Sequence, residues 1–578
     1  MKRKWISIIT VILIIVSALS GCSAQKKEAA QNIQAGTANE TQENAPAASA
    51  NTTIAASAST IEVDKEFTAR DLEVGYEESS AVLIVLNGTS ISVKGDGAAV
   101  TDQKVTIQKE GSYVIEGTLE DGQIIVDAGD TDKVQLILNG ASVHNSSNAP
   151  IYIKNADKVF ITLQEGTDNL LTDGAEYIQS DDNNVDAVIY SKADLTLNGS
   201  GSLTITGNYK HGIVSKDDLV FTGGIYDITA AKDAINGKDC VKIKDGSFTL
   251  NASSGNGIQS KNSDDTTKGY VYICGGTVNV ASSQEGIEGT VIIIEDGTIE
   301  INAGDDGLNA ASGSTDTAGA ENTASSWEAL KGKPSASEGT STLPAESGEN
   351  AAVTAQLPKD SAMPSGEVPE GGDTSRGPGG ADRGKPTSSD QMPFGQGQTP
   401  SGDMRPGGFG GGENPFETDA NCYISISGGT IIINAEGDGI DSNGNLSISG
   451  GTIYVDGPTQ SMNGSLDYSG NGDISGGILI AVGSSGMAQG FGETSTQYSL
   501  LYNLSAVNTN KDQITLNDAS GKEIISYTPK KSYQSVLISS PDMAQGETYT
   551  LTCGTQTAEI TLSSVFTTNG QRMGPGVK

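Results

Sequence analysis

The stretch Asn434–Val455 reads NAEGDGIDSNGNLSISGGTIYV and contains the pattern that decides the fold. Asp438 and Asp441 flank one apolar residue, Ile440, and the glycine pair Gly450–Gly451 follows. After the glycines, apolar side chains occur at every second position, which is the period of a strand with one buried face. The stretch therefore predicts short β-strands joined at a glycine turn.

The same pattern recurs along the chain at a basic interval of 21 to 23 residues, which insertions lengthen in some coils, most of all between Leu308 and Ile440. The apolar residue that corresponds to Ile440 forms a column made of Ile213, Ile235, Ile258, Ile287, Leu308, Ile440 and Leu466. Self-similarity with this period is typical of a solenoid whose repeats stack on one another. No helical stretch fits between the strands, so we predict an all-β fold. It is a right-handed parallel β-helix with three short strands per coil of ~22 residues.

Stacked coils place equivalent residues in columns about 4.8 Å apart. The preceding column, two positions before the apolar residue, reads His211, Asp233, Asn256, Glu285, Asp306 and Asp438. The following column, one position after it, reads Val214, Asn236, Gln259, Glu288, Asn309, Asp441 and Asp467. We expect both columns to point outward. Stacked carboxylates repel one another, and an oxygen-only set of Asp and Asn suits calcium. Solvated turn residues explain the same pattern, because Asp-Gly and Asn-Gly are common turn sequences.

The chain divides into six predicted segments. Residues 1–22 form a signal peptide that ends in LSGC, which resembles a bacterial lipobox, so Cys22 is expected to carry a lipid anchor to the membrane. Residues 23–59 read as a flexible tether, and 60–310 as an N-terminal cap and the first coils. Residues 311–419 are rich in Pro, Gly and Ser and read as a disordered insert between coils. Residues 420–499 continue the coils, and 500–578 form a small antiparallel β cap and tail.

Composition narrows the possible functions. The net charge of -37 argues against a nucleic-acid partner, whose phosphates would be repelled. None of the six arginines falls in the coils, so an arginine-based lyase site is absent, whereas a lysine base remains open. The two tryptophans, Trp5 and Trp327, lie outside the coils. Stacking on a sugar would therefore fall to tyrosines such as Tyr454.

Several stretches resemble a family of clostridial surface lipoproteins, the carbohydrate-binding domain-containing proteins. They include GSYVIEGTLEDGQIIVDA, VQLILNGASV and GDGIDSNGNLSISGGTIYVDGP. The resemblance covers most of 82–552. It implies a pectate-lyase-type parallel β-helix that binds cellulose and polygalacturonate, carries calcium and has no established lyase activity. The family pattern D-G-I-x-G-K-D matches at Asp233, Ile235, Lys238 and Asp239, although Ala234 replaces a glycine.

We therefore predict a lipid-anchored protein on the extracellular face of a bacterial membrane that binds polysaccharide with the help of calcium. The predicted calcium ligands are Asp233, Asp239, Asp306, Asn309, Asp438 and Asp441. Tyr454 and Lys238 are the predicted sugar contacts, and no catalytic residue is assigned. Two alternatives stay open: a calcium-dependent polysaccharide lyase with a lysine base, and a structural surface protein.

Overall fold

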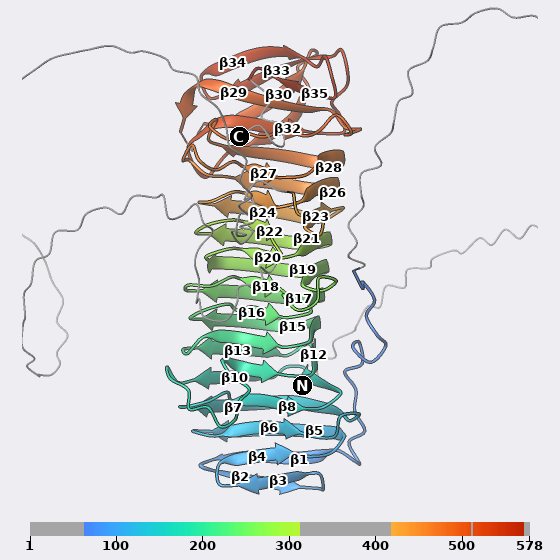
Figure 1. Cartoon of the computed structure of the whole chain (residues 1–578), viewed down its shortest axis with the longest axis vertical. Helices are drawn as coiled ribbons and strands as arrows, with labels where there is room; N and C mark the ends of the chain where they lie inside the picture. Colours follow the sequence, from blue (N-terminus) through green and yellow to red (C-terminus); the bar gives the residue numbers. More distant parts are fainter. Residues whose placement is uncertain (1–62, 313–417, 510–511, 571–578) are drawn as a thin grey trace, which may run out of the picture. The chain divides into compact units, whose positions relative to one another are not determined.

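The structure is a computed structural model that describes residues 63–312, 418–509 and 512–570. The predicted all-β class is confirmed, because no helix occurs in these ranges, and hence none that could cross a membrane. The predicted signal peptide with Cys22, the tether and nearly all of the insert lie outside the described residues. The strands of the described chain form sheets of 19, 12 and 4 strands (Figure 1).

The 12-stranded sheet contains one short strand from each coil. Its strands are β3 (Ala98–Thr101), β4 (Lys104–Ile107), β6 (Gln123–Asp127), β8 (Ile151–Asn155), β11 (Ala187–Ser191), β14 (His211–Ser215), β16 (Ile235–Gly237), β18 (Ile258–Ser260), β20 (Ile287–Gly289), β22 (Leu308–Ala310), β25 (Ile440–Ser442) and β27 (Leu466–Tyr468). From β4 to β27 every neighbouring pair is parallel. Each coil therefore stacks on the one before it.

The predicted apolar column is confirmed by the register of these short strands. Ile235 pairs with Ile258, and the pairing continues through every predicted member to Leu466. Leu308 and Ile440 are direct neighbours although 131 positions separate them in sequence. All members of the column have 0% exposed surface, so they form one wall of the hydrophobic core.

The 19-stranded sheet contains the rest of each coil. Its strands are β1 (Val82–Gly88), β2 (Ser90–Lys94), β5 (Gly111–Leu119), β7 (Lys133–Asn145), β9 (Lys158–Leu163), β10 (Asp168–Asp173), β12 (Asp194–Gly199), β13 (Ser202–Gly207), β15 (Asp218–Ala230), β17 (Cys240–Ala252), β19 (Tyr270–Ser283), β21 (Val291–Ala303), β23 (Tyr423–Ile426), β24 (Thr430–Ala435), β26 (Asn445–Asp456), β28 (Gly472–Gly483), β29 (Ser499–Asn508), β32 (Tyr533–Ser539) and β35 (Phe566–Thr568).

The count of three short strands per coil needs a correction. In β15, β17, β19, β21, β26 and β28 the two strands predicted on either side of the glycine turn form one long, bent strand. The bend in β17 lies at Gly246, whose φ is +127°, a value that L side chains rarely adopt. Glycine lets the chain turn there while pairing with the next coil resumes beyond it, so the strand bends instead of ending.

Different structures close the two ends of the stack. At the N-terminal end, β1 pairs with β2 and β3 with β4 as antiparallel hairpins. At the other end, β28 pairs antiparallel with β32, and β30 (Ile514–Asp518), β31 (Glu523–Tyr527), β33 (Thr548–Cys553) and β34 (Gln556–Thr561) form an antiparallel sheet. This C-terminal sheet is the antiparallel unit that the sequence predicts. The four cysteines of the described chain are unbonded.

Candidate functional site

The preceding column connects each coil to the next through its side chains. Asp306 Oδ1 accepts the backbone N–H of Asp438 at 2.6 Å, and Asp438 Oδ1 accepts that of Gly464 at 2.5 Å. Asp233 Oδ1 likewise accepts the N–H of Asn256 at 3.0 Å. Asn256 Oδ1 accepts the N–H of Glu285 in the same way, at 3.3 Å, so these four side chains each satisfy a backbone donor of the coil that follows.

The following column brings carboxylates together beside the preceding one. Asn309 lies next to Asp441 in the parallel register and next to Glu288 on its other side. The alternative of solvated turn residues does not fit several of these side chains, since Glu288 is 5% exposed, Asn309 8% and Asp438 8%. Dehydrated carboxylates at this spacing repel one another more strongly than they would in water.

This crowding raises the pKa of several carboxyl groups. Burial, with the nearby carboxylates of Asp306 and Asp438, raises the pKa of Asp441 well above its usual range. Burial and the charge of Asp305 raise the pKa of Asp306 to about 7. Burial and Glu288 raise the pKa of Glu285 in the same way. These groups favour bound protons or a bound cation over bare negative charge.

Two buried oxygen atoms among these residues have no hydrogen-bond partner. They are Asn309 Oδ1 and Glu285 Oε2. Glu288, by contrast, forms an ion pair with Lys261 and accepts bonds from Asn256 Nδ2 at 2.5 Å and Gln259 Nε2 at 2.6 Å. Unpartnered buried acceptors are uncommon, and a role in coordinating a cation is one physical reason for them. We call Glu285, Glu288, Asp306, Asn309, Asp438, Asp441 and Asp467 the acidic ladder.

The six predicted calcium ligands fall into two groups. Four of them, Asp306, Asn309, Asp438 and Asp441, belong to the acidic ladder. Glu285, Glu288 and Asp467 stand in the predicted columns but were not among the predicted ligands. Their burial and their charge interactions with the other carboxylates assign them to the acidic ladder, and neither property can be read from the sequence.

The other two predicted ligands already have partners within the chain. Asp233 accepts a bond from Asn236 Nδ2 at 2.7 Å and lies 3.1 Å from His211 Nδ1. Asp239 forms an ion pair with Lys268 and accepts a bond from Asn262 Nδ2 at 2.6 Å. Neither residue has a free carboxylate of the kind that a cation site needs.

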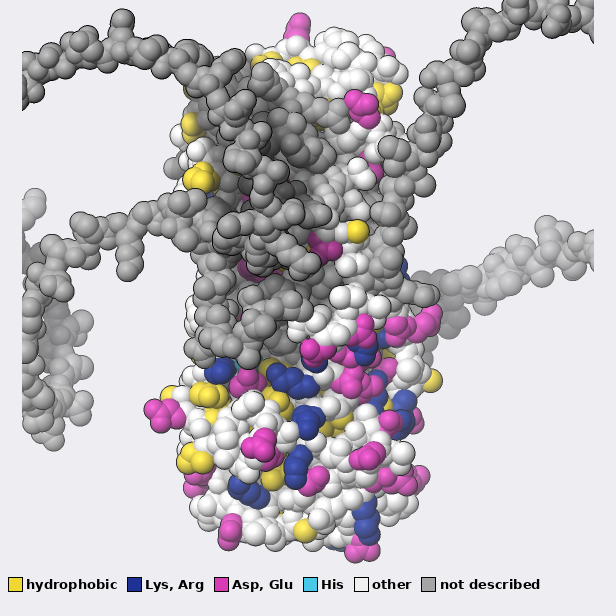
Figure 2. All heavy atoms as spheres, in the orientation of Figure 1, with side chains coloured by type: hydrophobic (Ala, Val, Ile, Leu, Met, Phe, Trp, Pro, Cys, Tyr) yellow, Lys and Arg dark blue, Asp and Glu magenta, His cyan; other side chains and the backbone are white. Residues whose placement is uncertain are grey.

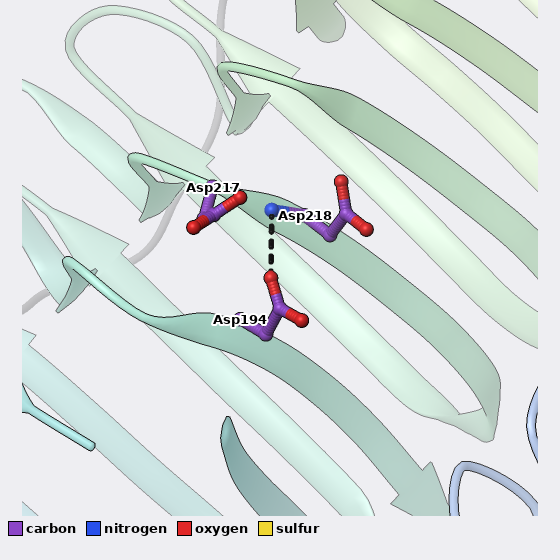
Figure 3. A group of neighbouring side chains, drawn as sticks. All are labelled: Asp194, Asp217 and Asp218. Carbon is purple, nitrogen blue, oxygen red and sulfur yellow. Dashed lines mark hydrogen bonds between the residues drawn. The ribbon is translucent and has the colours of Figure 1, made fainter. Parts of the chain in front are cut away.

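A separate group of carboxylates lies at the corner between the two sheets. Oxygen atoms of Asp194, Asp217 and Asp218 lie within 4.8 Å of one another (Figure 3). Asp218 N donates to Asp194 Oδ1 at 3.4 Å, and Cys240 Sγ donates to Asp218 Oδ1 at 3.2 Å. Burial and Asp194 raise the pKa of Asp217 to about 6. The sequence analysis missed this corner, although the repeated pattern SKAD and SKDD marks it.

The two predicted sugar contacts lie in different surroundings. The ring of Tyr454 stacks on that of Tyr527, with centroids 5.0 Å apart and planes at 12°. Tyr527 of the C-terminal sheet therefore covers one face of the Tyr454 ring. Lys238 Nζ lies 2.5 Å from Asp264 Oδ2 at the surface. Their role in sugar binding stays a prediction.

Tyrosines extend the following column toward the N-terminus. Tyr190 pairs in register with Val214 on one side and Tyr152 on the other. Both rings are 2% exposed and lie edge to face, with centroids 5.9 Å apart. Tyr190 Oη donates to the carbonyl of Asn183 at 2.6 Å. The shared pattern I-Y-x-K could have revealed this extension in the sequence.

Comparison with known proteins shows which family the chain belongs to. Residues 101–363 match the family model described as carbohydrate-binding domain-containing protein. A protein of Acetivibrio thermocellus with the same description is 38% identical over 195 residues, which make up 33% of this chain and 68% of that protein. The chain belongs to this family. Among solved structures, a polysaccharide lyase-like protein from C. thermocellum is 36% identical, and the match covers 39% of this chain and 90% of that one with a TM-score of 0.34.

In this carbohydrate-binding domain-containing protein the match covers only part of the acidic ladder. The range 101–363 contains Glu285, Glu288, Asp306 and Asn309, whereas Asp438 and Asp441 lie beyond it. The ladder is nevertheless continuous, because β25 pairs directly with β22.

Proposed function

We propose that the protein is a cell-surface lipoprotein that binds polysaccharide with the outer face of a right-handed parallel β-helix. Membership of the carbohydrate-binding domain-containing family carries the proposal. The parallel stacking of the coils supports the β-helix. The lipobox-like LSGC at Cys22 supports lipid anchoring on the extracellular face of the membrane.

We further propose that the acidic ladder holds calcium. Its donors are oxygen atoms alone, from carboxylates and from the Asn309 amide, and this set fits a hard cation. The unpartnered Asn309 Oδ1 and Glu285 Oε2 support the fit. Bound calcium would offset the repulsion in the ladder and could attract a uronate carboxylate. Asp306, Asn309 and Asp441 are the residues we expect to hold it, with Glu285 beside them.

Sedimentation with insoluble polysaccharide tests both proposals. The full chain is mixed with cellulose or with calcium-free, cross-linked polygalacturonate, in calcium or in chelator. We expect binding in calcium and weaker binding to polygalacturonate in chelator. Asp306→Asn with Asp441→Asn should reduce the effect of chelator, whereas the exposed Asp96→Asn should leave it unchanged. Failure to bind any polysaccharide would favour a purely structural surface protein.

A lyase remains the second candidate, because Lys216 and Lys238 directly precede the carboxylates Asp217 and Asp239 in adjacent coils. In such an enzyme a lysine would take the proton next to a uronate carboxylate, as a positioned general base. Ultraviolet absorbance of soluble polygalacturonate incubated with the protein decides between the two. A steady rise from unsaturated product would support the lyase, and a flat trace supports binding alone.

A further inference from the structure

Five lysines occupy the same position in five consecutive coils. Each lies three residues after the core apolar residue of its short strand, on strands β8 to β18 or directly after them. They are Lys154, Lys192, Lys216, Lys238 and Lys261, and we call them the lysine ladder. The backbone confirms the stacking, because Lys216 N donates to Ser191 O at 2.8 Å and Lys238 N to Ser215 O at 2.9 Å. The ladder thus repeats at the strand spacing of about 4.8 Å.

The rungs of this ladder differ in how far their charge is neutralised. Lys154 lies 3.0 Å from Asp127, Lys238 lies 2.5 Å from Asp264, and Lys261 pairs with Glu288. Lys192 and Lys216 are exposed, and neither forms an ion pair within 4.0 Å among the described residues.

The contacts of these two central lysines are with neutral groups. Lys192 Nζ donates to Asn183 Oδ1 at 2.8 Å, and Lys216 Nζ lies 5.4 Å from the ring centre of Tyr190. Both contacts fix the direction of the side chain, and neither brings a carboxylate to its ammonium group. The centre of the ladder therefore presents two adjacent cations to solvent.

Two more lysines lie at the other end of the short strands β14 and β16. Lys210 and Lys232 each lie three residues before the core residue of β14 and β16, and Lys232 N donates to Lys210 O at 2.7 Å. Cations thus flank both sides of these short strands. Figure 2 shows several Lys and Arg side chains on the visible face of the N-terminal coils, with Asp and Glu side chains among them.

The negative charge of the rest of the chain makes the lysine ladder unusual. The whole chain has a net charge of -37, so its average field repels anions. A regular row of cations inside such a field attracts a ligand whose own negative charges repeat along a line. Simple charge balance predicts lysines paired with carboxylates, which is what the outer rungs show but Lys192 and Lys216 do not. Asp194 and Asp218, which follow these two lysines by two residues, accept hydrogen bonds from Asp218 N and Cys240 Sγ.

We propose that the lysine ladder binds a linear, carboxylate-bearing polysaccharide that lies along the stacking direction of the coils. The inference rests on the proposed polysaccharide binding and adds the place on the surface where an acidic chain lies. Lys192 and Lys216 provide the central contacts. Lys238 joins them when a uronate displaces the exposed Asp264.

The test compares two pairs of substitutions of equal charge in the full chain. Lys192→Gln with Lys216→Gln removes the central rungs. Lys94→Gln with Lys109→Gln removes two exposed lysines near the N-terminal hairpins. Binding to soluble polygalacturonate and to neutral cellulose is measured across a range of salt concentrations. We expect each ladder lysine to contribute about two- to fivefold to polygalacturonate affinity. The ladder pair should also flatten the salt dependence and leave cellulose binding unchanged.

The possible results separate this inference from the function on which it rests. Equal loss of polygalacturonate binding in both variants, or no loss in either, would overturn the ladder. Parent protein that binds cellulose but not polygalacturonate would overturn the ladder and keep polysaccharide binding. Parent protein that binds neither polymer would overturn both. Melting curves that match the parent exclude unfolding as the cause of a loss.

Discussion

Opposing interactions act on the pKa of the Asp306 carboxyl group. The group accepts the backbone N–H of Asp438, which favours the charged form, yet burial and Asp305 favour the protonated form. The second influence is larger, so the pKa lies near 7 where an ordinary aspartate has 3.8. Near neutral pH this group therefore exchanges between a proton and negative charge, and a calcium ion would compete with the proton.

The stability of calcium-free protein should consequently depend on pH. The pKa of Asp306 is raised on folding, so its stabilising contribution is fully present below 3.8 and is lost as the pH rises through about 7. We expect the melting temperature in chelator to fall over this window, and Asp306→Asn to make the fall shallower. Asp96→Asn is the matched control at an exposed site. Parallel curves for the parent and Asp306→Asn would contradict the prediction.

For single residues, the sequence predicts the position in the stack of coils better than it predicts the burial and the contacts of the side chain. The spacing of the apolar residues correctly places Asn309 beside Asp441, because strand register follows from the repeat alone. It does not reveal that Asn309 is buried or that Asp239 pairs with Lys268. Those features depend on how side chains from other coils fill the space around each column.

Among the elements, the segment 63–76 has no equivalent in the repeat and was not predicted. It crosses the outer face of the 19-stranded sheet: Lys65 pairs with Glu295 of β21, and Arg70 Nη2 donates to Gln135 of β7. We call this segment the strap. Its sequence has no periodic pattern, so only tertiary contacts place it. The bent long strands were missed for a related reason, since a glycine turn looks the same in sequence whether or not pairing resumes beyond it.

Asp71 is the residue that fixes the strap most firmly. It is 2% exposed, accepts bonds from Thr68 N and Thr196 Oγ1, and lies 2.8 Å from Lys158 Nζ. Asp71→Ala would leave Lys158, whose side chain is 14% exposed, without its partner, so we expect the free energy of unfolding to fall by about 3 kcal/mol. Denaturant titration measures this loss.

Lys65 offers a control on the same strap. It pairs with Glu295 of the sheet at 2.7 Å, but the two side chains are 44% and 36% exposed. Lys65→Ala should therefore lower the free energy of unfolding by less than about 1 kcal/mol. Equal losses for Lys65→Ala and Asp71→Ala would show that burial does not set the strength of the strap.

Considered as a whole, the described chain joins the coils and the C-terminal sheet through a shared hydrophobic cluster. Ile480 and Val482 of β28 pack with Leu500, Ile514 and other residues of the C-terminal strands. The solenoid pattern predicts that its last coil needs a cover, because exposed strand edges favour aggregation. It cannot predict which side chains make the contact, since β29 to β35 lie outside the repeat.

The contact between the two parts depends on a buried carboxylate. Asp456 is 0% exposed, and it accepts bonds from Tyr527 Oη at 2.7 Å and from Lys530 N at 3.2 Å. Removing the hydroxyl would leave Asp456 Oδ2 buried without that donor, which costs about 1–3 kcal/mol. Because the cluster is shared, we expect the coils and the C-terminal sheet to unfold together.

Tyr527→Phe should therefore lower the whole melting transition and keep it single. Tyr498→Phe is the matched control, because its hydroxyl donates to Gln545 at the surface, at 3.2 Å, and water can replace that bond. Differential scanning calorimetry distinguishes the possible results. If Tyr527→Phe splits the transition in two, the C-terminal sheet unfolds as a unit independent of the last coil. If both variants melt like the parent, the Asp456 contact contributes no net stability, and the shared cluster alone holds the cover in place.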